Sequence, residues 1–490
     1  MPAIACRLVA FGALAALLTG CATNPATGKR QLSLVSEQQE IQIGRQTDPQ
    51  IVQQYGLYDD PDLAAYVDEI GQRLAAESER PDLPWTFRVL DDPVVNAFAL
   101  PGGFIYMTRG IMAHFSSEAE LAAVLGHEIG HVTARHGADR LSKAQLANLG
   151  LGVGMIAAPE LAQAFGGLAQ SGLQLLFLQH SRDDEREADA LGFRYAQLEN
   201  YDPGAFVDVF RMLSASSGGS EGARLPTYLS THPHPEERMQ TAQERVDALP
   251  PEQRAGERGQ ERHMRLIEDV IFGPDPRQGF FQGRDFVHPD LAFRLTLPSG
   301  WTAFNTRSAV VALSPDEDAM FQLMLAPEET TEAAARSFYG QQGIQLGQSW
   351  RDQRGGLALE QERYFSAGTG EQQILGTAAF SRYDGRTYRL LGAARSNAWN
   401  DAGRPLQETI DSFAQLTDRR LLRVEPQRVR LVTLDRPMTL EQFNIRYPSD
   451  VPMETLRRLN HHLEDTIPRG TQVKRIVGFD SGEQMGVKLQ

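Results

Sequence analysis

The sequence predicts an α+β protein in which a mainly helical N-terminal half with a small sheet precedes a strand-rich C-terminal half. From Ser36 to about Ala248 most apolar residues recur at helical spacing. From about Gly283 apolar and polar residues alternate instead, which is typical of half-buried strands. At 490 residues the chain is too long for one ordinary hydrophobic core, so we expect two to four domains.

The first twenty residues are typical of a bacterial lipoprotein signal. Arg7 precedes an apolar run, residues 8–18, that is too short to span about 30 Å of hydrocarbon comfortably. The run leads into Leu-Thr-Gly-Cys, so we predict a signal peptide over residues 1–20 and a lipid on Cys21. An uncleaved anchor and an ordinary secretory signal are the alternatives. The lipoprotein interpretation predicts a periplasmic protein, anchored to the outer membrane because Ala22 follows the cysteine.

Charge and cysteine content exclude several classes of function. The formal net charge is −15, so the chain has no excess of positive charge to attract the phosphates of nucleic acid, and we predict no nucleic-acid partner. For the same reason we expect membrane attachment through lipid and not through a basic surface. The only cysteines are Cys6, inside the predicted signal, and Cys21, at the predicted lipid site. The folded part therefore has no disulfide and no thiol nucleophile, which excludes a cysteine protease.

The chain divides by composition into further segments. We expect a polar tether over residues 21–35 and a mainly helical domain over residues 36–250. Residues 85–90 and 104–107 of this domain predict strands, because β-branched and aromatic residues there are bounded by turn residues. Residues 251–282 are charged and rich in proline, and we expect a linker there.

Residues 283–418 predict an α+β domain of unknown role. Residues 291–297 alternate as a strand, and Asp384-Gly385 predicts a hairpin turn between two further strands. Pro405 is expected to open a helix, because proline is favoured at the first helical position. Leu406, Ile410 and Phe413 would share one face of that helix.

One segment has the residue types and spacing of a zinc site. Ser117 begins a capping-box pattern, and we expect a helix from about Glu118 to His136. Residues four apart lie about 40° apart around a helix, so His127 and His131 present their imidazoles to one point, as a tetrahedral zinc site requires. Glu128 then projects beside the metal, where it can take a proton from an activated water. Two histidines satisfied by core partners are the alternative.

The third ligand is expected from a second helix. His136 lies nine residues after His127, about 180° around the helix, so we expect it to face away. Downstream, Ser181 begins a helix on which Glu185 and Asp189 stand one turn apart, on a stripe with small residues. A carboxylate pair on such a stripe requires a partner such as a metal. We predict that Glu185 ligates zinc and that Asp189 accepts the free ring N–H of a ligand histidine. The alternative for Glu185 and Asp189 is a solvated charged helix face. His180 and Arg135 are assigned no role.

These two motifs, together with the segment Asn96–Gly103, resemble the gluzincin family of zinc metalloproteases that includes HtpX, the CAAX prenyl proteases and the periplasmic protease BepA. The resemblance spans about Leu34 to Arg245 and implies a zinc metalloprotease domain over residues 36–250. It implies one Zn²⁺ per chain, and it implies these roles: zinc ligands His127, His131 and Glu185, general base Glu128, and a catalytic role for Asp189. We find no helical repeats of the kind that follow the protease in BepA, so BepA's particular partners are not assumed.

Two more segments of this domain bear on the site. A substrate in extended form is expected to pair with an edge strand near residues 104–107. Thr231–Arg238 resembles the family's His-Pro-x-Pro-x-x-Arg segment, and His232 is expected to serve as an oxyanion donor or as a fourth ligand that blocks the resting enzyme. A rigid surface loop is the alternative. Residues 146–178 are apolar and predict either a mobile lid or two buried helices.

The C-terminal residues 425–480 resemble a LysM module, a small β-α-α-β unit. The matching positions include Thr439-Leu440, Leu459-Asn460 and the run Ile467–Thr471. The resemblance implies either peptidoglycan binding or a spacer of unknown partner.

These observations predict a zinc metalloendopeptidase that cleaves unfolded or misassembled cell-envelope proteins, including outer-membrane proteins. A protease-like chaperone or assembly factor for outer-membrane proteins is one alternative. A peptidoglycan-associated module is the other.

Overall fold

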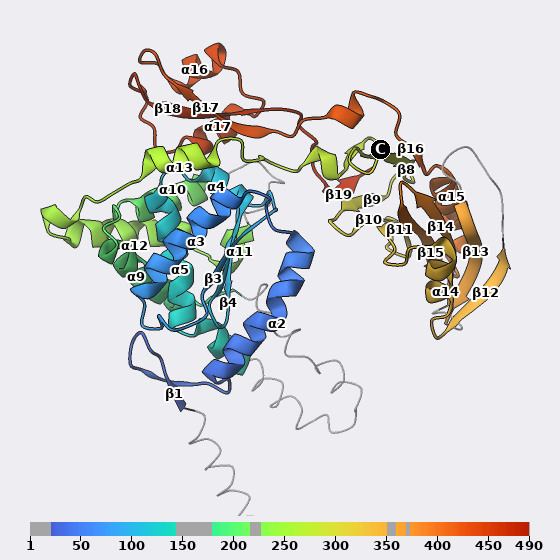
Figure 1. Cartoon of the computed structure of the whole chain (residues 1–490), viewed down its shortest axis with the longest axis horizontal. Coiled ribbons are helices and arrows are strands. Elements are labelled where there is room, and N and C mark those ends of the chain that lie inside the picture. The colour runs from blue at the N-terminus through green and yellow to red at the C-terminus, as the bar shows by residue number, and fades with distance from the viewer. Residues whose placement is uncertain (1–20, 144–178, 216–226, 350–358, 369–372, 490) are drawn as a thin grey trace, which may run out of the picture. The chain divides into compact units, whose positions relative to one another are not determined.

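The computed structural model describes residues 21–143, 179–215, 227–349, 359–368 and 373–489 (Figure 1). The chain separates into two compact units, of which the first holds residues 1–272 and 428–476 and the second holds residues 273–427 and 477–490. Helices and sheets occur in both, which confirms the predicted α+β class. The predicted signal peptide and the apolar segment 146–178 lie outside the described residues. Among the helices that are described, none has the length and apolar character needed to cross a membrane.

The first unit is a set of helices around a three-stranded sheet. Before residue 272 its helices include α2 (Glu37–Tyr55), α3 (Pro61–Ala76), α4 (Arg109–His114), α5 (Glu118–Thr133), α9 (Arg182–Leu198), α10 (Ala205–Ala215), α11 (Thr227–Thr231), α12 (Pro235–Ala248) and α13 (Gln260–Ile267). Its sheet has the order β3-β5-β4, with bounds Thr86–Leu90 for β3, Phe104–Thr108 for β5 and Ala97–Leu100 for β4.

Strand β4, and not β5, forms the edge of this sheet. The sequence placed the edge near residues 104–107, which was wrong. Ile105 of β5 lies opposite Phe87 of β3 on one side and opposite Ala99 of β4 on the other. All five residues of β5 are buried. The four-residue strand β4 is short and lies between turn residues, so the sequence pattern did not separate it from the loop.

Helix α5 packs closely against α9. Every residue of α5 is buried. Gly126 and Gly130 of α5 face Gly192 and Ala188 of α9, and a Cβ atom added at Gly130 would stand 2.9 Å from the carbonyl oxygen of Ala188. The small residues therefore allow the two backbones to approach, which brings the side chains of both helices to one point.

Helix α5 ends at Thr133, three residues earlier than the sequence predicted. Arg135 follows in the left-handed conformation, with φ of 63°. Its side chain forms an ion pair with the buried Glu40 and donates to the carbonyl of Val35 at 2.7 Å. Arg80 donates to the same Glu40 and to the carbonyl of Val132, each at 2.9 Å. These contacts terminate the helix and turn the chain before His136.

The segment predicted as a tether is folded onto the first unit. Strands β1 (Cys21–Thr23) and β2 (Arg30–Leu32) pair with each other. Asn24 is buried, and its Nδ2 atom donates to Oε1 of Glu187 on α9 at 3.1 Å. Val35 is also buried, in a small cluster with residues of α2 and of the chain after α5.

Residues 428–476, which we name the C-terminal module, belong to the first unit. The module runs β17 (Arg428–Thr433), α16 (Leu440–Arg446), α17 (Met453–Leu459) and β18 (Gln472–Val477), and β17 pairs with β18. It has a small core of its own. Helix α17 lies beside α4 and α10 (Figure 1). Helix α13, inside the segment expected to be a linker, buries His263, Met264 and Ile267 in the same unit.

The second unit contains two antiparallel sheets. The larger has the order β12-β13-β14-β15-β11-β10-β9-β19 and the smaller the order β16-β8-β7-β6. The strands of the larger sheet are β9 (Thr302–Asn305), β10 (Ala309–Leu313), β11 (Ala319–Leu325), β12 (Ile344–Ser349), β13 (Leu359–Ala367), β14 (Ile374–Tyr383), β15 (Arg386–Arg395) and β19 (Met485–Lys488). Those of the smaller are β6 (Phe280–Gln282), β7 (Asp285–His288), β8 (Phe293–Thr296) and β16 (Ala414–Gln415).

Two local predictions for this unit have different outcomes. The Asp384-Gly385 hairpin is confirmed, because both residues have positive φ and join the paired strands β14 and β15. The prediction that Pro405 opens a helix was wrong. Helix α15 (Trp399–Asp411) begins six residues earlier and holds Pro405 in its interior. The described part of the unit also contains α14 (Thr331–Tyr339). Leu406 and Ile410 are fully buried beneath the sheet, which outweighs the proline's missing backbone donor.

Candidate metal centre

Three separate elements bring four donor side chains to one buried point. His127 and His131 come from α5, Glu185 from α9, and His232 from the residue that follows α11. One ligand atom from each side chain lies within 4.8 Å of the others. Each of the four side chains is at most 4% exposed. The structure thus brings together the three predicted ligands and the more distant His232.

The spacing of these atoms fits a tetrahedral metal site. Nε2 of His131 lies 3.0 Å from Nε2 of His127 and 3.3 Å from Oε1 of Glu185. Nδ1 of His232 lies 3.2 Å from Nε2 of His127 and 3.0 Å from Oε1 of Glu185. Ligands held at about 2.0–2.1 Å from zinc stand about 3.3 Å apart in a tetrahedron. Nitrogen and carboxylate donors in this arrangement suit Zn²⁺.

The protonation of the donors suits a cation as well. Burial, and the neighbouring His127 ring, lower the pKa of His131 well below its usual value. Burial alone would raise the pKa of Glu185, but Arg238 and His232 hold it well below its usual range. A neutral imidazole and an ionised carboxylate are the forms that bind a metal.

Asp189 lies where the sequence predicted, against the second nitrogen of a candidate ligand. Its Oδ1 atom is 2.9 Å from Nδ1 of His127. This contact holds the proton of His127 on Nδ1 and leaves Nε2 for the metal. Burial alone would raise the pKa of Asp189, but Arg238 and His127 lower it to about 2.

Arg238 is a site residue that the sequence did not identify. Its guanidinium is buried and lies 2.7 Å from Oε2 of Glu185 and 2.7 Å from Oδ1 of Asp189. It therefore compensates both buried carboxylates and fixes their positions. The sequence does show an arginine at the end of the Thr231–Arg238 segment. Its pairing with Glu185 and Asp189 becomes visible only in the structure, where it lies one turn into α12.

Glu128 stands beside the donor cluster and not in it. Its side chain is buried, and its Oε1 atom has no hydrogen-bond partner among the described residues. Nε2 of His232 approaches that oxygen to 3.6 Å. A buried carboxylate oxygen without a donor is costly unless it serves a function, which suits a group that receives a proton from substrate or water.

His136 and His180 form a second layer around His131. The Nδ1 atoms of His131 and His136 lie 2.8 Å apart, and Nε2 of His136 is 3.3 Å from Oε2 of Glu187. The ring of His180 lies 3.7 Å from that of His131. The prediction that His136 faces away was wrong, because the helix ends before this residue.

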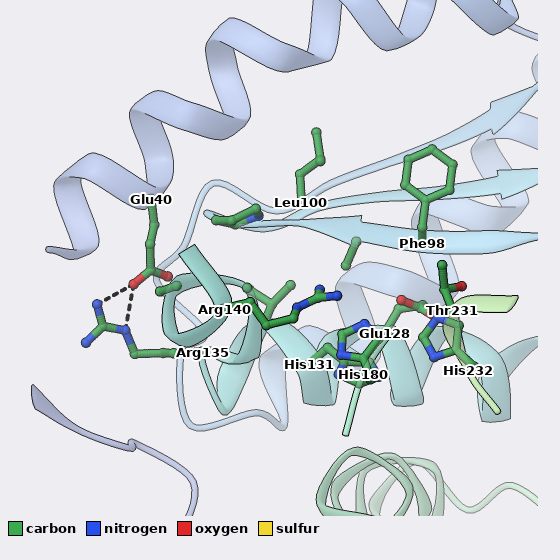
Figure 2. A pocket seen from close by; sticks show the side chains of 15 residues that line it. Glu40, Phe98, Leu100, Glu128, His131, Arg135, Arg140, His180, Thr231 and His232 are labelled. Atoms are coloured by element: carbon green, nitrogen blue, oxygen red, sulfur yellow. Dashed lines mark hydrogen bonds and ion pairs between the residues drawn. The ribbon is translucent and has the colours of Figure 1, made fainter. Parts of the chain in front are cut away.

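A narrow cleft runs between the donor cluster and the edge strand β4. It is lined by Glu128, His131, His180 and His232 on one side and by Phe98 to Pro101 on the other. Figure 2 shows the side chains of Phe98 and Leu100 pointing away from Glu128 and His232, on the side of β4 where they pack with Ile51 of α2, so the backbone of β4 borders the donor cluster. The cleft's empty volume is about 500 Å³, counted together with the solvent-filled space at its mouth.

Comparisons with known proteins place residues of this unit near one peptidase family. Residues 61–246 match the model of peptidase family M48. A putative beta-barrel assembly-enhancing protease of Vibrio cholerae is 35% identical over 202 residues, which cover 40% of this chain and 41% of that protein. The beta-barrel assembly-enhancing protease of Escherichia coli K12 is 30% identical over 236 residues, covering 47% of this chain and 48% of that protein.

A mitochondrial metalloendopeptidase OMA1 of Arabidopsis thaliana is 38% identical over 160 residues, covering 32% of this chain and 31% of that protein. The chain thus spans less than half the length of these three relatives. The similarity includes the donor cluster and leaves the second unit without a counterpart in the family model, which ends at residue 246.

Proposed function

We propose, from the premise that residues 61–246 are a domain of peptidase family M48, that the protein is a zinc-dependent metalloendopeptidase. The observation that carries this proposal is the buried convergence of His127, His131 and Glu185 on one point, with the Glu128 carboxylate beside it.

In this proposal His127, His131 and Glu185 would hold a zinc ion, which would supply Lewis-acid activation of a water molecule and of the scissile carbonyl. Glu128 takes the proton of the attacking water and passes it to the leaving amine. Asp189 keeps His127 in the tautomer that leaves Nε2 free, and Arg238 holds both carboxylates of α9 in place.

We assign His232 to the fourth donor position. Its Nδ1 atom is as close to His127 and Glu185 as a fourth tetrahedral ligand would be. Its ring stacks on Tyr228 at 4.4 Å, which fixes its orientation. A site with four protein donors is closed, whereas a catalytic site keeps one position open. We infer that this arrangement is the resting form and that His232 must move before water can be activated.

The proposed substrate is an extended peptide segment that pairs with β4. Among the described strands none pairs with the outer side of β4, and this strand borders the cleft. Main-chain pairing gives little sequence preference. We propose unfolded or misassembled cell-envelope proteins, including outer-membrane proteins, as the substrate class. The names of the Vibrio and Escherichia relatives, which describe enhanced β-barrel assembly, support this choice.

The proposed location is the periplasm, with a lipid on Cys21 holding the chain to the outer membrane. The lipoprotein-type sequence that ends at this cysteine supports the proposal. A chaperone-like role is a second candidate, favoured by the occupied fourth donor position, because such a site can bind substrate strands without cutting them. The β-α-α-β order of the C-terminal module supports peptidoglycan as a further candidate partner.

The test compares purified wild-type protein with Glu128→Gln, both loaded with one equivalent of Zn²⁺. An unfolded outer-membrane protein is the substrate, and cleavage is followed on gels. We expect cleavage by the wild type only, with equal zinc content in both proteins. Equal cleavage by both proteins, or no bound metal in the wild type, rejects the hydrolase. Suppressed aggregation without cleavage favours the chaperone role.

A further inference from the structure

We propose that the C-terminal module positions the zinc-binding helix α5, and that Lys474 is the positioning residue. The expected effect on zinc binding rests on the proposed function, because α5 carries His127, Glu128 and His131. The contacts that support it lie far from these side chains.

Lys474 lies on β18 and is fully buried, at 0% exposure. Its ammonium group donates to the carbonyls of Ala113 and His114 at 3.1 Å each and of Phe115 at 2.6 Å. These carbonyls close the C-terminal end of α4, where a helix leaves carbonyls without intrahelical partners and favours a cation. Lys474 thus caps this helix from about 360 residues further along the chain.

The capped end of α4 leads directly into α5. Ser117 is the N-cap of α5, and its hydroxyl accepts from the backbone N–H of Glu120 at 3.3 Å. The backbone N–H of Ser116 donates to the Glu120 carboxylate at 2.9 Å. Only one residue separates Phe115 from the cap, so a movement of the α4 end displaces the start of α5.

The module makes a second contact on the first turn of α5. Nε2 of His461 lies 3.4 Å from Oε2 of Glu120, whose side chain is fully buried. Burial alone would raise the pKa of Glu120, but His461, Ser116 and Lys474 lower it to about 2. The module therefore places the Lys474 ammonium and the His461 ring near an ionised carboxylate in the first turn of α5.

Lys474 is itself held in place. Its backbone N–H donates to Oδ1 of Asn460, and Nδ2 of Asn460 donates to its carbonyl, both at 2.9 Å. Asn460 is buried at the end of α17, next to α4 (Figure 1). The ammonium is thus delivered by a fixed backbone, which suits a positioning role.

The consequence for the metal centre follows from the burial of α5. Removing the ammonium leaves buried carbonyls short of a donor, and the connection between α4 and α5 must relax to satisfy them. A helix that is buried along its whole length moves as a body, and His127 lies nearly three turns beyond the cap. We therefore expect weaker zinc binding in a protein that remains folded.

The test uses the full-length protein and the variant Lys474→Met, which keeps the length of the side chain and removes the charge. The control Arg457→Met removes a charge from an exposed side chain of the same module. Zinc dissociation constants are measured by chelator competition well below the melting temperature. Amide hydrogen exchange is followed over residues 116–123. Because burial lowers the pKa of Lys474 to about 7, the measurements are made below that pH.

We expect Lys474→Met to weaken zinc binding about tenfold or more, as loss of a support to a metal ligand typically does, and to accelerate exchange at the start of α5. The control should change neither quantity. A folded Lys474→Met protein with wild-type zinc affinity and exchange overturns the proposal, even if its stability is lower.

If Lys474→Met does not fold, His461→Leu probes the contact with Glu120 through the same two measurements. Unchanged values in that folded variant overturn the proposal. Neither readout requires peptide cleavage, so failure of the proposed protease activity is distinguishable from failure of this inference. Hydrogen exchange also remains informative in a protein that binds no zinc.

Discussion

The Nδ1 atoms of His131 and His136 lie 2.8 Å apart, although ideal helical geometry directs the two residues to different sides. The contact exists because α5 ends at Thr133 and Arg135 turns the chain back. His131 can donate from Nδ1 to His136, which in turn reaches Glu187. This chain of contacts orients the His131 ring, whose Nε2 atom lies in the donor cluster.

His136→Ala should therefore weaken zinc binding about 10- to 100-fold, the usual effect of removing a partner of a ligand histidine. Chelator competition measures the change. His234→Ala is the matched control, because His234 begins α12 outside the donor cluster. Equal zinc affinity of His136→Ala and the wild type would show that this contact does not support the ligand.

Gly192→Val should separate α9 from α5. A Cβ atom at Gly192 would stand 2.6 Å from the backbone nitrogen of His127, so the helices must part. We expect a loss of about 1–3 kcal/mol in the free energy of unfolding, as for other overpacked sites, together with weaker zinc binding. Ala190→Val, on the exposed face of α9, is the control for helix propensity. Urea titration and chelator competition report the two effects.

His232→Ala should raise the rate of peptide cleavage at saturating zinc, because it vacates the fourth donor position. It should also weaken zinc binding, since one donor is lost. Steady-state cleavage of an unfolded substrate measures the first effect. A fall in kcat of about 10²-fold or more would instead identify His232 as an oxyanion donor.

His263 should make the protein sensitive to acid. Its Nδ1 atom is 3.0 Å from the Tyr66 hydroxyl and its Nε2 atom is 3.0 Å from the carbonyl of Phe115, so both nitrogens are satisfied in the neutral ring. Burial, with Lys474 nearby, lowers the pKa of His263 to about 3. Between that value and about 6.5 the unfolded chain binds the extra proton, so stability falls as the pH falls through this window.

Titration of His263 alone should change the free energy of unfolding by about 1.4 kcal/mol per pH unit within this window. Urea unfolding of the metal-free protein at several pH values measures it, and His263→Gln should show a shallower slope by that amount. Parallel slopes in the two proteins would assign the acid sensitivity to other groups.

Local spacing explains which parts of the site the sequence could predict. His127 and His131 share a helix face, and Glu185 and Asp189 share another, so each pair follows from helical geometry alone. The meeting of the two pairs followed from a family resemblance. His136 was misplaced because the end of α5 is set by Glu40 and Arg80, which are distant in sequence.

Long-range contacts explain what the sequence could not predict. Arg238 and Lys474 are ordinary basic residues in the sequence, and only the fold shows that both are buried against oxygen acceptors. The mixed α+β class and the Asp384-Gly385 turn were predictable because they depend on periodicity and turn chemistry. The edge position of β4 was not, because strand order is a tertiary property.

The docking of Asn24 on Glu187 has a spatial consequence. If Cys21 carries the proposed lipid, only two residues, Ala22 and Thr23, lie between the acylated residue and the docked Asn24. An extended chain covers about 3.3 Å per residue, so the segment from Cys21 to Asn24 reaches about 10 Å. A lipid at this position would therefore hold the first unit within a thin layer next to the bilayer surface.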